Sequence, residues 1–397
     1  MIPVDEALAR ILSAFHVLPG EQVAISDAHG RVLAEDTVAR LTKPPTDVSA
    51  MDGYAVIGSD VEQAPAKLKV VGMAPAGDAY GAEIKAGEAV RIFTGGPLPK
   101  GADTIVIQEL TDASGDAVTI NEPIQRGRYV RRRGLDFSEG DKGPAAGTRL
   151  EPRHIALIAS MNIPWLTVTR RPRVAILGTG DELVMPGEPA GDHQIVSSNT
   201  IALAAMIEQA GGEAINLGIA RDNETSLKRM AAGAANADLL VVTGGMSVGE
   251  RDLVRQVLGD EGLDVDFWKI AMRPGKPLTF GRLNGTPMLG FPGNPVSSIV
   301  CGMLFMRPAI DAMLGVSEPS VTYETARLGA PLAANDERQD YLRGRLSRDE
   351  NGERLVTSYD IQDSSMLATI ADSDCLIMRP PHAPAAAAGE TVRYVLL

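Results

Sequence analysis

The 397-residue sequence contains few cysteines, histidines and aromatic residues. Its two cysteines, Cys301 and Cys375, show no spacing typical of a disulfide framework or a zinc site, so we expect a reducing compartment. Aromatic residues make up only 4% of the chain, which argues against a platform that stacks nucleic-acid bases. The five histidines are scattered without metal-ligand spacing. Any metal chemistry therefore has to use other side chains.

Positive charge is also scarce. The chain has 38 lysines and arginines against 51 aspartates and glutamates, a formal net charge of −13. This balance argues against non-specific binding to DNA, RNA or anionic lipid. We expect no apolar span of 18 residues, and the N-terminus carries acidic residues where a signal peptide carries basic ones. The sequence predicts a cytoplasmic protein without nucleic-acid or membrane partners.

The pattern of apolar residues changes several times along the chain. Residues 3–15 have the spacing of an amphipathic helix, and 21–150 contain short β-type runs between glycine turns. From 172 to about 314, strands alternate with helices, and short strands return from about 319. The length predicts two to four domains. We predict a doubly wound, mainly parallel α/β domain combined with β-rich parts, the last of them a small barrel or sandwich.

Four polar loops of the α/β region follow apolar strands: 178–183, 220–225, 243–252 and 291–298. Because such loops gather at one edge of a parallel sheet, we expect them to bind a ligand together. Glycines allow close approach to the backbone, and helix N-termini favour anions. A tight turn or a helix cap is the alternative for each loop. The predicted binding residues here are Gly178, Thr179, Gly180, Asp181, Ser197, Asn199, Gly244, Gly245, Ser247, Gly249, Glu250, Pro292, Gly293, Asn294, Pro295 and Ser297.

A basic cluster lies in the segment "FWKIAMRPGKPLTF" (267–280). Lys269, Arg273 and Lys276 have no acidic residue between them, and Pro274 and Gly275 shape the turn. In a chain of negative net charge, three such cations suggest an anion-binding clamp. The alternative is a solvated basic turn.

Three carboxylates follow three different strands of the α/β region: Asp181, Asp222 and Asp252. Carboxylates facing phosphates at one sheet edge suggest Mg²⁺, which takes one or two carboxylates together with ligand oxygens and water. Asp222 and Asp252 could instead be helix N-caps.

The β-rich half contributes three further candidates. Asp52 lies in "SAMDGYAV" (49–56), Thr94 lies in "RIFTGGPLP" (91–99), and Asp136 follows a basic run. From composition alone, each of the three could have either a structural role in a turn or a role in the functional site.

Six motifs in this order resemble the MoeA/gephyrin E-domain family, the molybdopterin molybdenumtransferases. They are "SAMDGYAV", "RIFTGGPLP", "GTGDEL", "TGGMSVGERD", "FWKIAMRPGKP" and "FPGNPVSS". The resemblance spans nearly the whole chain and implies a four-domain subunit. It implies a molybdopterin-binding α/β domain (1–20 and 163–318), an elongated connecting domain (21–39 and 140–162), a β-rich domain (40–139) and a C-terminal barrel-like domain (319–397).

The family resemblance also implies an activity. It implies that molybdate is inserted into adenylated molybdopterin with Mg²⁺-dependent release of AMP, at a site shared between the two subunits of a homodimer. The functional residues carried over are Asp52, Thr94, Asp136, Asp222, Asp252, Lys269 and Lys276. Arg273 stands where some relatives have lysine, and His154 receives no role.

Three other functions remain open from the sequence. Two are enzymatic, the adenylylation of molybdopterin and the insertion of tungstate, and the third is a non-catalytic role as a dimeric scaffold. A molybdopterin adenylyltransferase and proteins that mature molybdoenzymes are the partners that the resemblance suggests.

Overall fold

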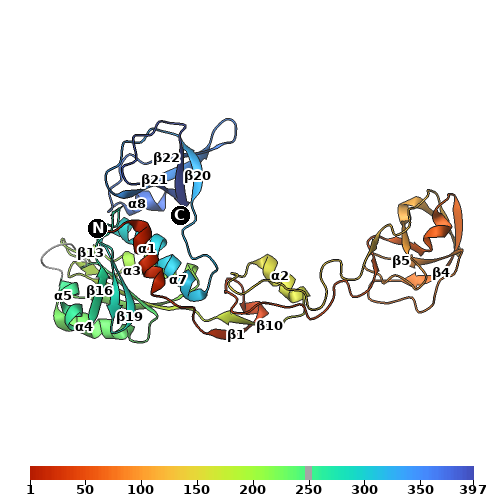
Figure 1. The fold of residues 1–397 in the computed structure, drawn as a ribbon, viewed down its shortest axis with the longest axis horizontal. Helices are drawn as coiled ribbons and strands as arrows, with labels where there is room; N and C mark the ends of the chain where they lie inside the picture. Colours follow the sequence, from red (N-terminus) through yellow and green to blue (C-terminus); the bar gives the residue numbers. More distant parts are fainter. Residues whose placement is uncertain (246–252) are drawn as a thin grey trace.

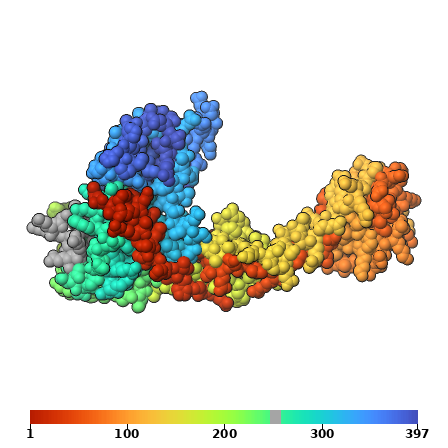
Figure 2. All heavy atoms as spheres, viewed as in Figure 1, coloured from red at the N-terminus to blue at the C-terminus, as the bar shows by residue number. Residues whose placement is uncertain are grey.

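The chain is elongated, with two bulky ends joined by a slender middle (Figures 1 and 2). The structure, a computed structural model, describes residues 1–245 and 253–397. One end holds an α/β domain with a C-terminal barrel packed against it, and the other end holds a β-rich domain (Figure 1). The predicted combination of α/β and β domains is confirmed.

The α/β domain is built on a six-stranded sheet in the order β14-β11-β15-β19-β18-β16. The pairs β14–β11, β11–β15 and β15–β19 are parallel, whereas β19–β18 and β18–β16 are antiparallel. The strands are β11 (Arg173–Thr179), β14 (Glu213–Ala220), β15 (Leu239–Thr243), β16 (Leu263–Phe267), β18 (Thr279–Leu283) and β19 (Thr286–Phe291). All five residues of β15 are buried, which is typical of a central strand covered on both faces. The parallel half of the sheet carries the predicted ligand loops.

Helices cover both faces of this sheet (Figure 1). They are α1 (Val4–Ser13), α3 (Asn199–Gln209), α4 (Glu224–Ala231), α5 (Leu253–Asp260), α6 (Pro295–Cys301) and α7 (Arg307–Leu314), with a π-helical turn, η5 (Gly302–Met306), between the last two. The predicted helix at 3–15 is confirmed as α1, whose Val4, Ala7 and Ile11 enter the core beside α7.

One apolar stretch differs from the expectation. The continuous helical run Pro295–Leu314 is long and apolar enough to cross a membrane by length and composition, so the expected absence of such a span was wrong. However, 72% of its 18-residue window is buried inside the protein. The run is the core helix of the α/β domain, where an all-round apolar surface is expected.

The slender middle consists of an antiparallel strand pair and one helix. Strand β1 (Gly20–Ala24) pairs with β10 (Trp165–Thr169), and α2 (Pro152–Ser160) packs beside them. This pairing joins residues 165–169, which the sequence analysis assigned to the α/β domain, to β1. A two-stranded sheet of β2 (Val48–Ser49) and β9 (Val130–Arg131) leads into the β-rich domain.

The β-rich domain contains a six-stranded sheet in the order β6-β3-β5-β4-β8-β7. Its strands are β3 (Gly53–Val56), β4 (Ala66–Ala74), β5 (Glu88–Ile92), β6 (Thr104–Ile107), β7 (Thr111–Ser114) and β8 (Ala117–Ile120). Two separate clusters of buried hydrophobic side chains support it.

The C-terminal domain is a five-stranded closed barrel, because β21 pairs with both β22 and β23. Its strands are β20 (Glu324–Leu328), β21 (Gln339–Arg348), β22 (Arg354–Ser358), β23 (Cys375–Arg379) and β24 (Thr391–Leu396), with helix α8 (Leu367–Ala371). Strand β17 (Met272–Arg273) of the α/β region pairs in parallel with β21. The predicted barrel is thus confirmed, and it is attached to the α/β domain through backbone hydrogen bonds.

Candidate functional site

A cavity of about 630 Å³ lies at the carboxyl edge of the parallel strands. The chain passes from β11 through α3 to β14 on one side of β11, whereas β15 lies on the other side. Ligands of doubly wound sheets bind at such a reversal of strand order. The lining residues are Thr179, Glu182, Leu183, Ile195, Val196, Ser197, Ser198, Asn199, Thr243, Gly244, Gly245, Pro277, Pro292, Gly293, Asn294, Pro295, Ser365 and Leu367.

Glycine is required where two of the loops touch. Gly244 and Gly245 have φ of 91° and 59°, in the left-handed region. A Cβ atom on Gly244 would lie 2.3 Å from the carbonyl oxygen of Thr179. The loop after β15 therefore lies directly against the loop after β11, and its backbone forms part of the cavity wall.

Small polar side chains join the loops around the cavity. Asn199 Nδ2 donates to the carbonyl oxygen of Gly293 at 2.8 Å and to Thr243 Oγ1 at 3.0 Å. Thr243 Oγ1 in turn lies 3.3 Å from Ser298 Oγ. Thr179 Oγ1 is buried and has no hydrogen-bond partner in the part of the chain that the structure describes. A buried hydroxyl without a partner costs about 1–3 kcal/mol, so the wall suits a ligand with polar atoms.

Two of the predicted metal ligands, Asp181 and Asp222, lie side by side, although neither lines this cavity. The backbone N–H of Asp222 donates to Asp181 Oδ1 at 3.1 Å. Partial burial, followed by the charges of Asp181 and Glu182, raises the pKa of Asp222. Asn223, and not Asp222, caps α4, because its Oδ1 accepts from the N–H of Ser226. The N-cap alternative for Asp222 was therefore wrong.

These carboxylates fit a weakly held divalent ion rather than a closed protein cage. No group of three or more histidine, cysteine, aspartate or glutamate side chains is arranged for a metal ion among the described residues. Mg²⁺ needs only one or two carboxylates when phosphate oxygens and water complete its shell. The remaining predicted residues of the loop after β15, Ser247, Gly249, Glu250 and Asp252, lie outside the described residues.

The structure divides the predicted basic cluster into two parts. Arg273 forms an ion pair with the buried Asp340 of the barrel and lies 3.4 Å from Asp336. Its charge is therefore used in the contact between domains. Lys269 and Lys276 have no carboxylate partner within the described chain, and Lys276 precedes Pro277 of the cavity wall. The two lysines remain the cations predicted to bind an anion.

The turn between them is packed against the core. The N–H of Ile270 donates to the carbonyl oxygen of Lys276 at 3.0 Å, which places the two ends of the turn side by side. Gly275 has a φ of 113°, and a Cβ atom there would lie 2.2 Å from Met272 Cε and 2.9 Å from Cys301 Sγ. Pro274 follows Arg273 directly in this turn.

The β-rich domain brings together two of its three candidates. Asp52 Oδ1 accepts hydrogen bonds from the backbone N–H and the hydroxyl of Thr94, both at 2.7 Å. These hydrogen bonds lower the pKa of Asp52. Asp136 instead forms an ion pair with Lys43 at 3.2 Å. Figure 1 shows β4 and β5 of this domain at the opposite end of the chain from the cavity-lining β13 (Ile195–Val196).

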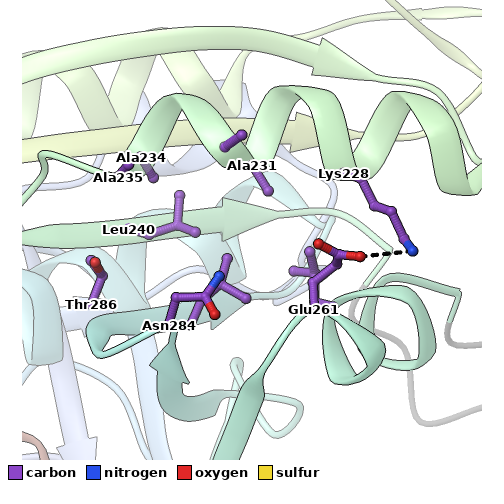
Figure 3. A pocket seen from close by; sticks show the side chains of 11 residues that line it. Lys228, Ala231, Ala234, Ala235, Leu240, Glu261, Asn284 and Thr286 are labelled. Carbon is purple, nitrogen blue, oxygen red and sulfur yellow. Dashed lines mark ion pairs between the residues drawn. The ribbon is translucent and has the colours of Figure 1, made fainter.

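A second cavity, of about 160 Å³, carries none of the predicted residues (Figure 3). It lies between α4, the end of α5 and the β18–β19 turn. Ala231, Ala234 and Leu240 line it, and an ion pair between Lys228 and Glu261 at 2.7 Å borders it. Its volume is below the range of about 300–1,000 Å³ that is typical of ligand pockets.

Comparison with known proteins places this geometry in a family. Three family profiles match: MoeA N-terminal region (domain I and II) at residues 2–162, probable molybdopterin binding domain at 175–312, and MoeA C-terminal region (domain IV) at 325–397. A Haemophilus influenzae protein named molybdopterin molybdenumtransferase is 35% identical over 99% of this chain and 98% of its own length. The chain belongs to the molybdopterin molybdenumtransferase (MoeA) family.

Other members of the MoeA family agree over the full length. A molybdopterin molybdenumtransferase of Bacillus subtilis is 32% identical and covers all of this chain and 94% of its own. A crystal structure of a molybdopterin biosynthesis MoeA protein from Pyrococcus horikoshii superposes with a TM-score of 0.86 at 28% identity, covering both chains completely. The resemblance inferred from the six motifs is confirmed, as is the classification as a transferase.

Sequence reasoning missed several residues of the MoeA-type cavity. Thr243 and Ser298 belong to the network around Asn199, and Ser365 and Leu367 reach the wall from the C-terminal barrel. Thr243 and Ser298 are the first and last residues of two loops that were identified, although neither was named as a binding residue. For Thr243, a hydroxyl at the end of the buried strand β15 was the available signal. Nothing in the barrel sequence indicated that it would contribute.

Proposed function

We propose that this chain inserts molybdate into adenylated molybdopterin, with Mg²⁺-dependent release of AMP, as a cytoplasmic homodimer. One observation carries most of this proposal. The cavity of about 630 Å³ is walled mainly by loops of the segment 175–312, which matches the molybdopterin-binding profile. Its glycine backbone, hydroxyls and adjacent lysines suit a ligand that combines a ring system with phosphates.

The residues around the cavity have separable roles in this proposal. The backbone N–H of Gly245, together with Thr179 Oγ1, donates hydrogen bonds to the ligand, whereas the N–H of Gly244 donates to the carbonyl oxygen of Phe291. Lys269 and Lys276 attract its phosphates and the molybdate oxyanion. Asp181 and Asp222 hold Mg²⁺, whose positive charge would offset the charge on the pyrophosphate when it is bound. Asp252 is expected to assist them.

The second part of the proposal is that a partner subunit completes the site. Asp52 is ionised and held in one orientation by Thr94, as a functional carboxylate needs to be. Within one chain, however, its domain lies at the far end from the cavity (Figure 1). A two-fold dimer would place the β-rich domain of each subunit beside the cavity of the other.

The activity can be tested by measuring AMP release from adenylated molybdopterin. We expect release only when both molybdate and Mg²⁺ are present, and the product should activate a molybdenum-free apoenzyme. Release without molybdate would contradict the proposal. Consumption of ATP with formation of pyrophosphate would instead identify an adenylyltransferase, and a preference for tungstate would change the assigned oxyanion.

A further inference from the structure

An arginine of the β-rich domain, Arg91 of β5, contacts both of the segments that carry Asp52 and Thr94. Its guanidinium carbon lies 5.1 Å from the centre of the Tyr54 ring and 5.1 Å from the centre of the Phe93 ring. Tyr54 comes two residues after Asp52, and Phe93 directly precedes Thr94. Cations are attracted to aromatic faces at such distances, so the charged group joins the two segments.

The same guanidinium is anchored by two hydrogen bonds close to Asp52. Nη1 donates to the carbonyl oxygen of Gly53 at 3.3 Å, and Nη2 donates to Gln108 Oε1 at 2.6 Å. The backbone N–H of Gln108 donates in turn to the carbonyl oxygen of Asp52 at 3.1 Å. Because a guanidinium presents its donors in a fixed plane, these contacts restrict the backbone at Asp52.

Arg91 also acts on the charge of Asp52. Hydrogen bonds from the N–H and the hydroxyl of Thr94 are the main cause of the lowered pKa of Asp52, and the positive charge of Arg91 lowers it further. One arginine thus affects both the position and the ionisation of this carboxylate.

We propose that Arg91 is the positioning residue of the Asp52–Thr94 pair, and that it holds the two side chains in the geometry in which the β-rich domain presents them to the cavity of the other subunit. This inference rests on the proposed function, because it concerns a carboxylate that acts in that reaction. It gives a role to the first residue of the segment 91–99, in which only Thr94 had one.

The first test does not require turnover. The backbone amides of Thr94 and Gln108 both donate to Asp52, one to Oδ1 and the other to the carbonyl oxygen. Their hydrogen exchange in the native protein reports how often these hydrogen bonds open. Arg91→Met removes the donors and the charge, so it should speed exchange at both amides about tenfold in the full-length protein.

Arg126→Met is the matched control. Arg126 belongs to the same domain and pairs with Asp103, whose N–H donates to the carbonyl oxygen of Val56 at 3.1 Å, at the other end of β3. Removing it should leave exchange at the two reporting amides unchanged. Exchange in Arg91→Met equal to that of the wild type, or the same increase in both variants, would overturn the inference.

The second test separates positioning from general stability by kinetics. Binding of the substrate uses the cavity of the α/β domain, so Arg91→Met should lower kcat for AMP release about tenfold with KM nearly unchanged. Arg91→Lys should recover part of kcat, because lysine keeps the charge but is a point donor that cannot reach both acceptors. Arg126→Met should change neither constant, and a fall in kcat that it reproduces would show that only the stability of the domain matters.

Two outcomes separate this inference from the proposed function. If Arg91→Met does not fold, Arg91→Lys decides the question, because it should still speed exchange at Thr94, and unchanged exchange there would overturn the positioning role. Faster exchange in the variant without AMP release by the wild type would reject the proposed reaction and keep the structural role of Arg91. AMP release by the wild type with unchanged exchange in the variant would do the reverse.

Discussion

The ion pair between Arg273 and Asp340 should hold the C-terminal barrel on the α/β domain. Asp340 is 3% exposed, and one of its oxygens, Oδ1, has no hydrogen-bond partner within the described chain. Replacing Arg273 by methionine would leave this buried carboxylate without its cation. Exposed ion pairs contribute about 0.2–1 kcal/mol, and removing one partner of a buried pair costs about 3–5 kcal/mol. Because the side chain of Arg273 is 47% exposed, we expect a loss of about 2 kcal/mol.

The assay is urea unfolding of the variants. The midpoint of the transition in which the barrel unfolds is compared between variants whose m-values, the slopes of free energy against urea, are the same. Arg345→Met is the control, because Arg345 pairs with Asp372 in the same barrel but both side chains are more than half exposed. The control should lose less than about 1 kcal/mol. Equal midpoints for the two variants would refute the reasoning.

The loss of stability caused by Arg273→Met should depend on pH, because the carboxyl group that it leaves unpaired, Asp340, is buried. Burial raises the pKa of Asp340, and Arg273 partly offsets that rise. Without the arginine, the folded-state pKa should rise further, so protonation relieves the deficit. The deficit should therefore be largest above that pKa and shrink as the pH falls through it.

The double variant Arg273→Met/Asp340→Asn separates the two roles considered for this arginine. It should recover much of the stability, since no unpaired buried charge remains. If Arg273 serves only the domain contact, the double variant keeps the affinity for molybdate and AMP. Restored stability with lost anion binding would instead support the anion clamp predicted from the sequence.

Three further predictions concern single residues. Asp222→Asn should raise the Mg²⁺ concentration needed for half-maximal AMP release about tenfold, because it removes one of two adjacent carboxylates; an unchanged Mg²⁺ titration would contradict its role. Gly244→Ala should lose about 2–3 kcal/mol in urea unfolding, because the new methyl group meets Thr179 at a positive φ, whereas the open position Gly77→Ala, also at positive φ, reports the backbone strain alone. Burial alone would raise the pKa of Asp238, but hydrogen bonds from Arg170 and the N–H of Arg173 lower it. Asp238→Asn should therefore destabilise the protein near neutral pH, with a difference that begins to shrink near the ordinary carboxyl pKa of about 4 and disappears as the pH falls through the lowered folded-state pKa; a difference that persists below that pKa would refute the assignment.

The parts of the fold set by local patterns could be predicted from the sequence. The spacing of Val4, Leu8 and Ile11 indicated α1, and the buried run of β15 followed by glycines indicated a strand that ends in a ligand loop. Both signals lie within one element, where apolar periodicity follows directly from burial. The six motifs identified the family because several such loops occur in a fixed order.

Long-range contacts could not be predicted in the same way. The local run of basic residues predicted that Arg273 is part of an anion clamp. Its ion-pair partner Asp340 lies 67 residues further along the chain, so the local sequence could not indicate it. Ser364 meets Asn294 across 70 residues, so the contribution of the barrel to the cavity had no local signal. Asp222 and Asn223 are both good N-cap residues, and only the backbone geometry decides which of them caps α4.

The central claim is that two subunits form each site, and mixing two inactive variants tests it most directly. One variant carries Asp52→Ala in the β-rich domain, and the other carries Lys276→Ala beside the cavity. If each site uses the β-rich domain of one subunit and the cavity of the other, mixed dimers contain one intact site. Random re-assortment of equal amounts should then restore about a quarter of the wild-type AMP release. No recovery, although mixed dimers have formed, would contradict the shared site.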